Sequence, residues 1–208
     1  MRRRIQLVFG LAAGLWGASG CTGVSLDAVR ADATSGHGHL ITGVPFIPQE
    51  EYQCGPAALA MVLQFYGAAL GQEEIAQEIY LPSIRGTLNL DLELYARRRG
   101  FHARSFQGTL PRAKDELRRG HPLIVFQDLG VPLYPVPHFA VLLGYSDRAR
   151  VVVLHSGLTA FRIVSYADFE RSWGQRRAWG LLITPQGEGA VQDAPGAPEE
   201  GWTGSRPA

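Results

Sequence analysis

The sequence contains only two cysteines, Cys21 and Cys54, among its 208 residues. Cys21 ends a stretch that is typical of an export signal, so we expect it to be removed or modified during export. Cys54 then has no partner within the chain, which excludes a domain held together by internal disulfides. A solitary thiol in an exported protein is a candidate reactive group, although free cysteines are also often buried and inert.

An excess of charge of one sign is also absent. The chain carries 20 lysines and arginines against 19 aspartates and glutamates, a formal net charge of +1. Nucleic-acid binding needs a basic surface that this balance does not supply, so no nucleic-acid partner is expected. The sequence also lacks a glycine-rich phosphate loop and closely spaced metal ligands. We therefore expect neither a cofactor nor a metal.

Long apolar runs are missing except near the N-terminus. Arg2–Arg4 precede an apolar segment from Ile5 to Trp16, which is shorter than a helix needs to be to cross the hydrocarbon core of a membrane. The small residues before Cys21 resemble the lipobox of bacterial lipoproteins, although Ala18 stands where leucine is usual. The resemblance implies cleavage before Cys21 and lipid on its thiol.

Thr22, in place of aspartate, follows Cys21, and by the lipoprotein rule this favours the outer membrane, with the domain facing the periplasm. An ordinary cleaved signal peptide, which would leave a soluble periplasmic protein, is the main alternative. An uncleaved anchor is a further one.

Four segments follow from composition. Residues 1–21 are interpreted as a lipoprotein signal peptide, and residues 22–42, rich in Gly, Ser, Ala and His, as a flexible tether. Residues 43–185 carry regular apolar patterns and predict one domain, since 46% hydrophobic and 19% charged residues suit an ordinary globular core. Residues 186–208 offer little to bury and predict a disordered tail.

The domain begins with helical patterns and continues with strand patterns, which predicts an α+β fold with N-terminal helices packed on a mainly antiparallel sheet. Helices are predicted over 54–66, 73–81, 88–99, 110–119 and 166–173. Strands are predicted over 44–47, 101–106, 122–127, 138–145, 151–155, 161–164 and 179–183.

Cys54 opens the most apolar of these helices. Gly55 leaves room for close approach to the cysteine, and Pro56 is tolerated in a first turn because its missing N–H would be unpaired there. The helix dipole and the free amide donors of the first turn favour a thiolate, which is the nucleophilic form of cysteine. The best candidate base is His138, at the start of a predicted apolar strand. The alternative is that His138 is only a structural histidine.

These residues carry a family resemblance. The segment Gln53-Cys54-Gly55-Pro56-Ala57-Ala58-Leu59, with Gly120-His121-Pro122 and with His138-Phe139-Ala140-Val141-Leu142, resembles the C39 and C39-like cysteine peptidases, over about residues 44–185. The resemblance implies a papain-like fold and no cofactor. It also implies roles for named residues, with Cys54 as nucleophile, His138 as base and Gln49 as oxyanion donor. The family usually places that glutamine six residues before the cysteine, whereas Gln49 lies five before it, so Gln53 is a rival.

The third catalytic residue departs from the family pattern. Family members usually have Asp followed by Pro after the next strand, where this chain has His155-Ser156-Gly157. His155 is the predicted orienting residue, Ser156 and Asp128 are alternatives, and a pair without a third member is another. Cysteine chemistry tolerates a weak orienting residue, because an ion pair of thiolate and imidazolium already activates the nucleophile.

The functional hypothesis is an exported, membrane-tethered cysteine peptidase that hydrolyses peptide or amide bonds of a peptide or protein substrate and acts as a monomer. The family's usual task is to cut leader peptides in the cytosol within a transporter, which an exported chain with no ATPase motif does not match. Two alternatives remain, a non-catalytic peptide-binding module and an acyl or amide transferase that uses the same cysteine.

Overall fold

The computed structural model describes residues 23–131 and 133–187. The predicted signal peptide with Cys21, and the predicted tail from residue 188, lie outside the described residues. The helices are α1 (Leu26–Thr34), α2 (Cys54–Phe65), α3 (Gln72–Ile79), α4 (Asn89–Arg98), α5 (Leu110–Arg118) and α6 (Tyr166–Gly174). In the part of the chain that is described, no helix has the length and hydrophobicity needed to cross a membrane.

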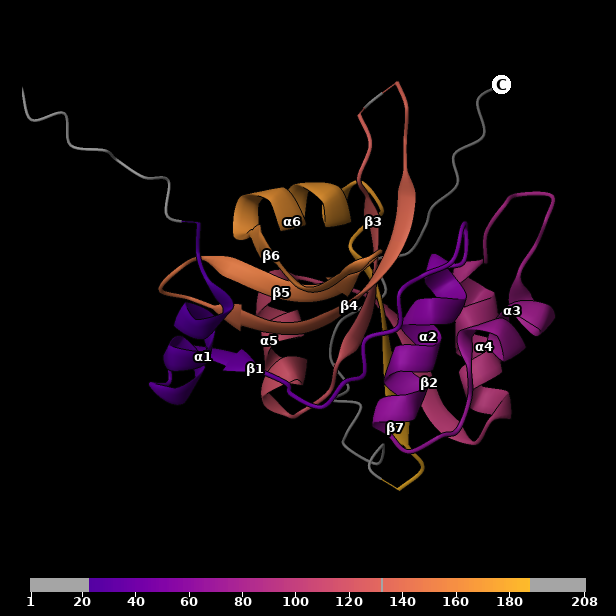
Figure 1. Ribbon diagram of the computed structural model, residues 1–208, viewed down its shortest axis with the longest axis horizontal. Coiled ribbons are helices and arrows are strands. Elements are labelled where there is room, and N and C mark those ends of the chain that lie inside the picture. The colour runs from indigo at the N-terminus through magenta and orange to yellow at the C-terminus, as the bar shows by residue number, and fades with distance from the viewer. Residues whose placement is uncertain (1–22, 132, 188–208) are drawn as a thin grey trace, which may run out of the picture.

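The strands form one antiparallel sheet, with the order β2-β7-β3-β4-β5-β6 and with β1 paired to β4 (Figure 1). Their bounds are β1 (Gly38–Leu40), β2 (Phe101–Gln107), β3 (Leu123–Asp128), β4 (Pro137–Ser146), β5 (Val151–Ser156), β6 (Thr159–Ser165) and β7 (Trp179–Pro185). Four predicted helices therefore precede most of the sheet, and the predicted α+β class is confirmed.

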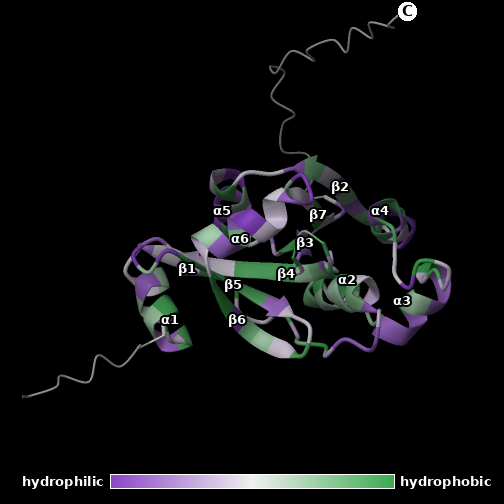
Figure 2. Ribbon diagram, turned by 90° about the horizontal axis from the view of Figure 1, so that it is seen from above, coloured by the Kyte–Doolittle hydropathy of each residue, from purple (hydrophilic) through white to green (hydrophobic). Residues whose placement is uncertain are grey.

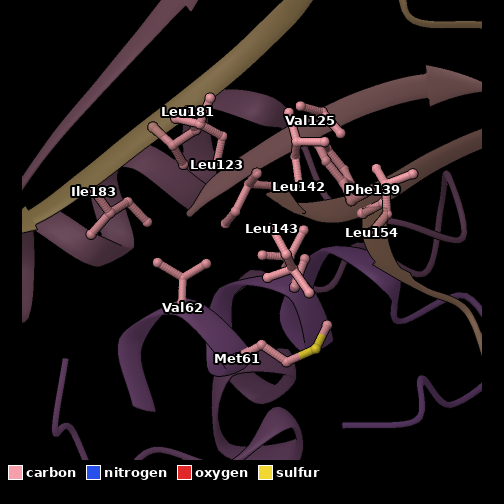
Figure 3. Close-up of a cluster of buried hydrophobic side chains, with 14 of the residues drawn as sticks. Met61, Val62, Leu123, Val125, Phe139, Leu142, Leu143, Leu154, Leu181 and Ile183 are labelled. Carbon is pink, nitrogen blue, oxygen red and sulfur yellow. The ribbon is translucent and has the colours of Figure 1, made fainter. Parts of the chain in front are cut away.

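The central helix α2 is buried because its sequence is apolar on every side. All its residues from Gly55 to Leu63 are buried, and each fully buried Leu or Val contributes about 1.5–3 kcal/mol to stability. Figure 3 shows Met61 and Val62 directed at Leu143 and the sheet. Figure 2 shows the hydrophobic strands β4 and β5 at the centre, with more hydrophilic helices around them.

The two faces of the sheet are covered by different helices. Helix α2 packs against β4 on the face that carries Phe139, whose ring lies close to Gly55. Helix α6 packs on the face that carries Gln127, whose side-chain amide donates to Ser172 Oγ at 2.7 Å. Gln127 pairs with His138 across β3 and β4, so the side chain of His138 shares the α6 face.

The predicted flexible tether over 22–42 is corrected by the structure. Ser25 caps α1 by accepting the N–H of Ala28 at 3.2 Å, and Val29 is fully buried in a small cluster with Val151 and Val153. Asp32, also buried, accepts the hydroxyl of Ser146 at 2.6 Å. This segment is part of the domain because a short apolar stripe and one buried carboxylate attach it to the sheet.

Strand β1 completes that attachment. Its residues pair with β4, and Gly38 faces Ser146. A Cβ atom on Gly38 would lie 2.4 Å from the carbonyl oxygen of Tyr145, so this close pairing requires glycine. The glycine that suggested flexibility in the sequence is therefore a packing requirement.

The predicted strand over 44–47 is also wrong. Val44 is buried there, but its carbonyl accepts a hydrogen bond from His155 Nε2 at 3.2 Å instead of pairing with a strand. Phe46 packs against the His155 ring at 5.2 Å. Apolar side chains dock this segment on the sheet, whereas its backbone forms no ladder.

We expect Val29→Ala to lower the free energy of unfolding by about 2 kcal/mol, because it leaves a cavity beneath Val151 and Val153. The measurement is urea denaturation of the protein from residue 22 onward. Arg30→Ala, whose side chain is 53% exposed, is the matched control on the same helix and should change stability little. Equal stability of the two variants would show that residues 26–34 do not pack on the domain and act only as a tether.

Candidate active site

Cys54 stands at the first residue of α2, where the chain turns sharply from an irregular loop into the helix. Tyr52, two residues earlier, has a left-handed backbone with φ 61°. Gly55 then packs closely, since a Cβ there would lie 3.1 Å from Thr87 Cβ and 3.4 Å from Phe139 Cδ2. The glycine after the cysteine is therefore needed to seat the first turn of α2 against β4 and the loop before α4.

The thiol of Cys54 is half-buried and free of any disulfide. Burial raises its pKa above the ordinary value, although the backbone N–H groups of Phe139, Gly55 and Cys54 itself act in the opposite direction. The net shift is upward, so the resting group at neutral pH is a thiol. The predicted thiolate is corrected, because the desolvation of the sulfur outweighs the amide donors of the helix start.

His138 is the second residue of β4, and it is 7% exposed. Burial, with a contribution from the positive charge of Arg162, lowers the pKa of His138 to about 4. The imidazole is therefore neutral at neutral pH. Because the N–H of Phe139 approaches the Cys54 sulfur, the nucleophile reaches the strand one residue from His138.

The Nε2 atom of His138 lies 3.0 Å from Ser156 Oγ. In the described part of the chain, no hydrogen bond is found at His138 Nδ1, and none joins the imidazole directly to the Cys54 sulfur. Nδ1 is thus the ring nitrogen left for a substrate or for the thiol. If Nε2 carries the proton and donates to Ser156, Nδ1 is the basic nitrogen.

Strand alternation explains why Ser156 reaches His138. Val141 pairs with His155 across β4 and β5, so Ala140 and Ser156, the next pair along, point to the opposite face. His138 lies two residues before Ala140 on that same face, diagonal to Ser156. The residue in the third position is therefore Ser156, which the sequence left as an alternative.

The predicted orienting role of His155 is corrected. Its side chain lies on the other face of the sheet and is fully buried. Nε2 bonds the carbonyl of Val44 at 3.2 Å, and Nδ1 accepts the N–H of Phe161 at 3.1 Å, so both ring nitrogens are used. Burial lowers the pKa of His155, which makes it a neutral structural histidine.

Asp128, the other alternative, is held in the hairpin between β3 and β4. Its carboxylate accepts the N–H groups of Gly130 at 2.9 Å and Val136 at 2.8 Å, and the Arg176 guanidinium at 2.6 Å. Burial acts to raise its pKa, but these amides and Arg176 bring the pKa below the usual value. Asp128 is thus committed to closing the hairpin and does not orient His138.

The two candidate oxyanion donors, Gln49 and Gln53, differ in what their side-chain amides contact. The backbone N–H of Gln49 donates to the carbonyl of Gly157 at 3.2 Å, which fixes its loop beside Ser156. Its side-chain amide has no hydrogen-bond partner among the described residues. The amide of Gln53 lies instead against Gln72 at 3.2 Å and Glu50 at 3.4 Å.

A set of exposed hydrophobic side chains, which we call the apolar rim and which sequence reasoning did not detect, occurs in the loops that carry or adjoin these residues in sequence. Exposed hydrophobic side chains occur next to each part of the site, at Tyr52, Ile84, Leu88, Leu129, Val131, Leu133, Tyr134, Val136 and Leu158. Several belong to the β3–β4 hairpin, which Figure 1 shows extending beyond the rest of the sheet. Exposed apolar clusters of this kind mark interaction surfaces, here one suited to an extended or amphipathic chain.

The sequence also missed Thr87 and Arg162. The Thr87 hydroxyl is buried against Gly55 and, within the described residues, has no hydrogen-bond partner. Arg162, on β6, supplies the charge that acts on His138. Neither residue type marks a site by itself. The same described residues contain no group of three or more His, Cys, Asp or Glu side chains that could hold a metal ion.

The structure thus has a cysteine at the start of a central buried helix and a histidine near the start of an antiparallel strand, within a papain-like α+β fold. Residues 41–180 match the profile of the Peptidase_C39 like family, and the chain therefore belongs to this family. A comparison with curated protein sequences gave no match.

Solved structures share the fold. A candidate C39-like peptidase from Bacillus anthracis has a TM-score of 0.57 and 19% identity, covering 72% of this chain and 98% of that one. The peptidase domain of Streptococcus ComA, a bifunctional ABC transporter of a quorum-sensing pathway, aligns with a TM-score of 0.55 and 22% sequence identity. The alignment covers 69% of this chain and 100% of the ComA domain. A double-glycine-motif protease from an AMS/PCAT transporter, solved in complex with the leader peptide, aligns with a TM-score of 0.53 and 22% sequence identity. The alignment covers 71% of this chain and 98% of that protease.

Proposed function

We propose that this protein is a cysteine peptidase in which Cys54 attacks a peptide carbonyl and His138 acts as general base. The proposal is supported by two contacts near the start of β4, one made by Cys54 and one by His138. The thiol lies against the Phe139 N–H, and the adjacent His138 keeps Nδ1 available while Ser156 holds Nε2.

The electrostatics of the site favour a neutral pair over a preformed ion pair. With the pKa of Cys54 raised and that of His138 lowered to about 4, the proton stays on sulfur at rest. During attack, the proton passes from Sγ to His138 Nδ1 while the sulfur bonds to the carbonyl carbon. The Cys54 backbone N–H and the Gln49 amide are the donors available to the oxyanion.

Collapse of the tetrahedral intermediate breaks the C–N bond, and the imidazolium of His138 returns its proton to the leaving amine. Water then attacks the thioester with His138 again as base, and this releases the carboxylic acid and restores the thiol. Ser156 accepts the Nε2–H throughout and so keeps the imidazole in the useful tautomer. It supplies no negative charge to the imidazolium, so catalysis is expected to be slower than with a carboxylate in that place.

The substrate is proposed to be a peptide or protein segment. The AMS/PCAT relative is a double-glycine-motif protease solved with a leader peptide, and the apolar rim around Cys54 suits a chain of that kind. A peptide-binding module without catalysis is the second candidate. It is favoured by the buried thiol and by the lack of a carboxylate at position 156. Transfer to an amine acceptor would use the same acyl-enzyme.

The direct test is cleavage of a proteome-derived peptide library by the segment from residue 22 onward, with Cys54→Ala and His138→Gln as inactive variants. We expect kcat/KM to rise as pH increases through about 4, where His138 loses its proton, and to stay level to neutral pH. His138→Gln should lower it by at least about 100-fold. Binding of peptides with no cleavage at any pH would establish the binding module instead.

Membrane tethering and a periplasmic location are proposed on the sequence alone, from the lipobox-like Ala18-Ser19-Gly20-Cys21. We expect the full-length chain, expressed in a Gram-negative host, to enter the detergent phase after export. The Cys21→Ser variant should stay in the aqueous phase or remain uncleaved. Equal partitioning of both proteins would contradict lipidation of Cys21 and would favour an ordinary signal peptide or an uncleaved anchor.

A further inference from the structure

A cleft of about 460 Å³ is lined by residues of β2, β3 and β7, of the start of α4 and of the loop after α6, and its lining is unlike the apolar rim. Its floor is aromatic, formed by Phe106, Phe126 and Trp179, and its walls carry Arg176, Arg177 and amide side chains. None of the described residues that line this cleft is acidic. The cleft therefore combines aromatic surface with two arginine side chains, and the guanidinium of Arg176 lies 5.4 Å from the centre of the Phe126 ring.

A single aromatic ring, that of Phe139, lies between the cleft and the first turn of α2. The Phe139 ring contacts the position of Gly55, the residue after Cys54. On its other side the same ring stacks on Phe126 at 4.5 Å and meets Trp179 edge-on at 5.8 Å, and both of these residues line the cleft. Phe139 is itself buried, and its ring joins the packing around the first turn of α2 to the aromatic lining of the cleft.

The positive charge in the cleft is only partly neutralised. Asp128 binds one end of the Arg176 guanidinium at 2.6 Å, but Arg176 Nε is buried and, within the described chain, without a hydrogen-bond partner. Arg177 makes no ion pair there. A buried N–H donor without an acceptor is costly, and a bound acceptor group would satisfy it.

The backbone that presents these arginines is strained. Arg177 and Ala178 have φ values of 55° and 47°, two consecutive left-handed residues that are not glycine. The loop is held in place because the N–H of Ala178 donates to Trp173 at 3.0 Å and its carbonyl accepts from Gly108 at 2.8 Å. Backbone strain of this kind, kept in place by surrounding hydrogen bonds, clusters at ligand sites.

From the cleft, its charge and its position, we propose that this is a specificity subsite for an acidic side chain of the substrate, close to the bond that is cleaved. The carboxylate pairs with Arg177 and with the guanidinium of Arg176, while the methylene stem of the side chain packs on Trp179. The proposal rests on the proposed peptidase function and names its substrate class. It predicts that glutamate or aspartate is preferred over the uncharged amide.

The test uses matched peptides in which Glu or Gln is placed at each of the three positions on either side of the cleaved bond. We expect one position at which Glu raises kcat/KM about tenfold over Gln. Arg177→Gln should reduce that preference to about twofold, and Arg177→Lys should keep most of it. Arg98→Gln, a change of equal charge on the exposed end of α4, should leave the preference intact.

A second measurement separates this proposal from the catalytic one. Fluorescence anisotropy of the Cys54→Ala protein with labelled Glu and Gln peptides reports binding without turnover. Glu-selective binding that is lost in the Cys54→Ala/Arg177→Gln protein supports the subsite even if the native chain cleaves nothing, in which case only the peptidase function fails. Equal cleavage and equal binding of Glu and Gln peptides, or a preference that survives Arg177→Gln, would overturn the proposal.

Discussion

The hydrogen bond of 3.0 Å between His138 and Ser156 is the interaction on which the rest of the site depends. It fixes one nitrogen of a buried imidazole and leaves the other without a hydrogen bond among the described residues. Because the acceptor is a hydroxyl, the imidazole keeps its orientation without a nearby negative charge, and burial lowers its pKa to about 4. In the proposed mechanism the site therefore works with a neutral thiol and a neutral base, and not with a preformed ion pair.

The fold supplies this arrangement through packing. An apolar helix buried from Gly55 to Leu63 brings Cys54 to the sheet, and glycine at 55 lets Thr87 and Phe139 approach closely. Pairing between β4 and β5 sets which residue meets His138, because a shift of one position would exchange Ser156 for His155. The Phe139 ring then lies between the first turn of α2 and an arginine-lined cleft, so in our proposals one strand serves both catalysis and selectivity.

Much of this could be predicted from the sequence. The apolar run after Cys54 and the alternating strands carry strong local signals, and the helix and strand ends agree to within one or two residues at most positions. The family-like segments around Cys54 and His138 indicated the family to which residues 41–180 belong. Gly67, Gly100 and Gly120 follow their helices with positive φ, as expected of helix-ending glycines.

The remaining features depend on contacts between distant parts of the chain. Residues 26–40 are polar and rich in small side chains, yet Val29 and Asp32 find partners on β5 and β4 that no local pattern reveals. The role of His155 was misassigned because adjacent strand residues face opposite sides, and register decides between them. The thiolate was wrongly predicted because the helix dipole is local, whereas the burial of the sulfur is a property of the whole fold.

The central claim is tested most directly by an NMR titration of His138 in the folded protein, together with Ser156→Asp. We expect the native imidazole to titrate at about 4, and the introduced carboxylate to raise that pKa by about 2 units because it stabilises the protonated ring. Thr42→Asp, which adds the same charge at an exposed position, should leave the titration unchanged. A native pKa near 6.5, or one that Ser156→Asp does not move, would contradict the buried neutral base held by Ser156.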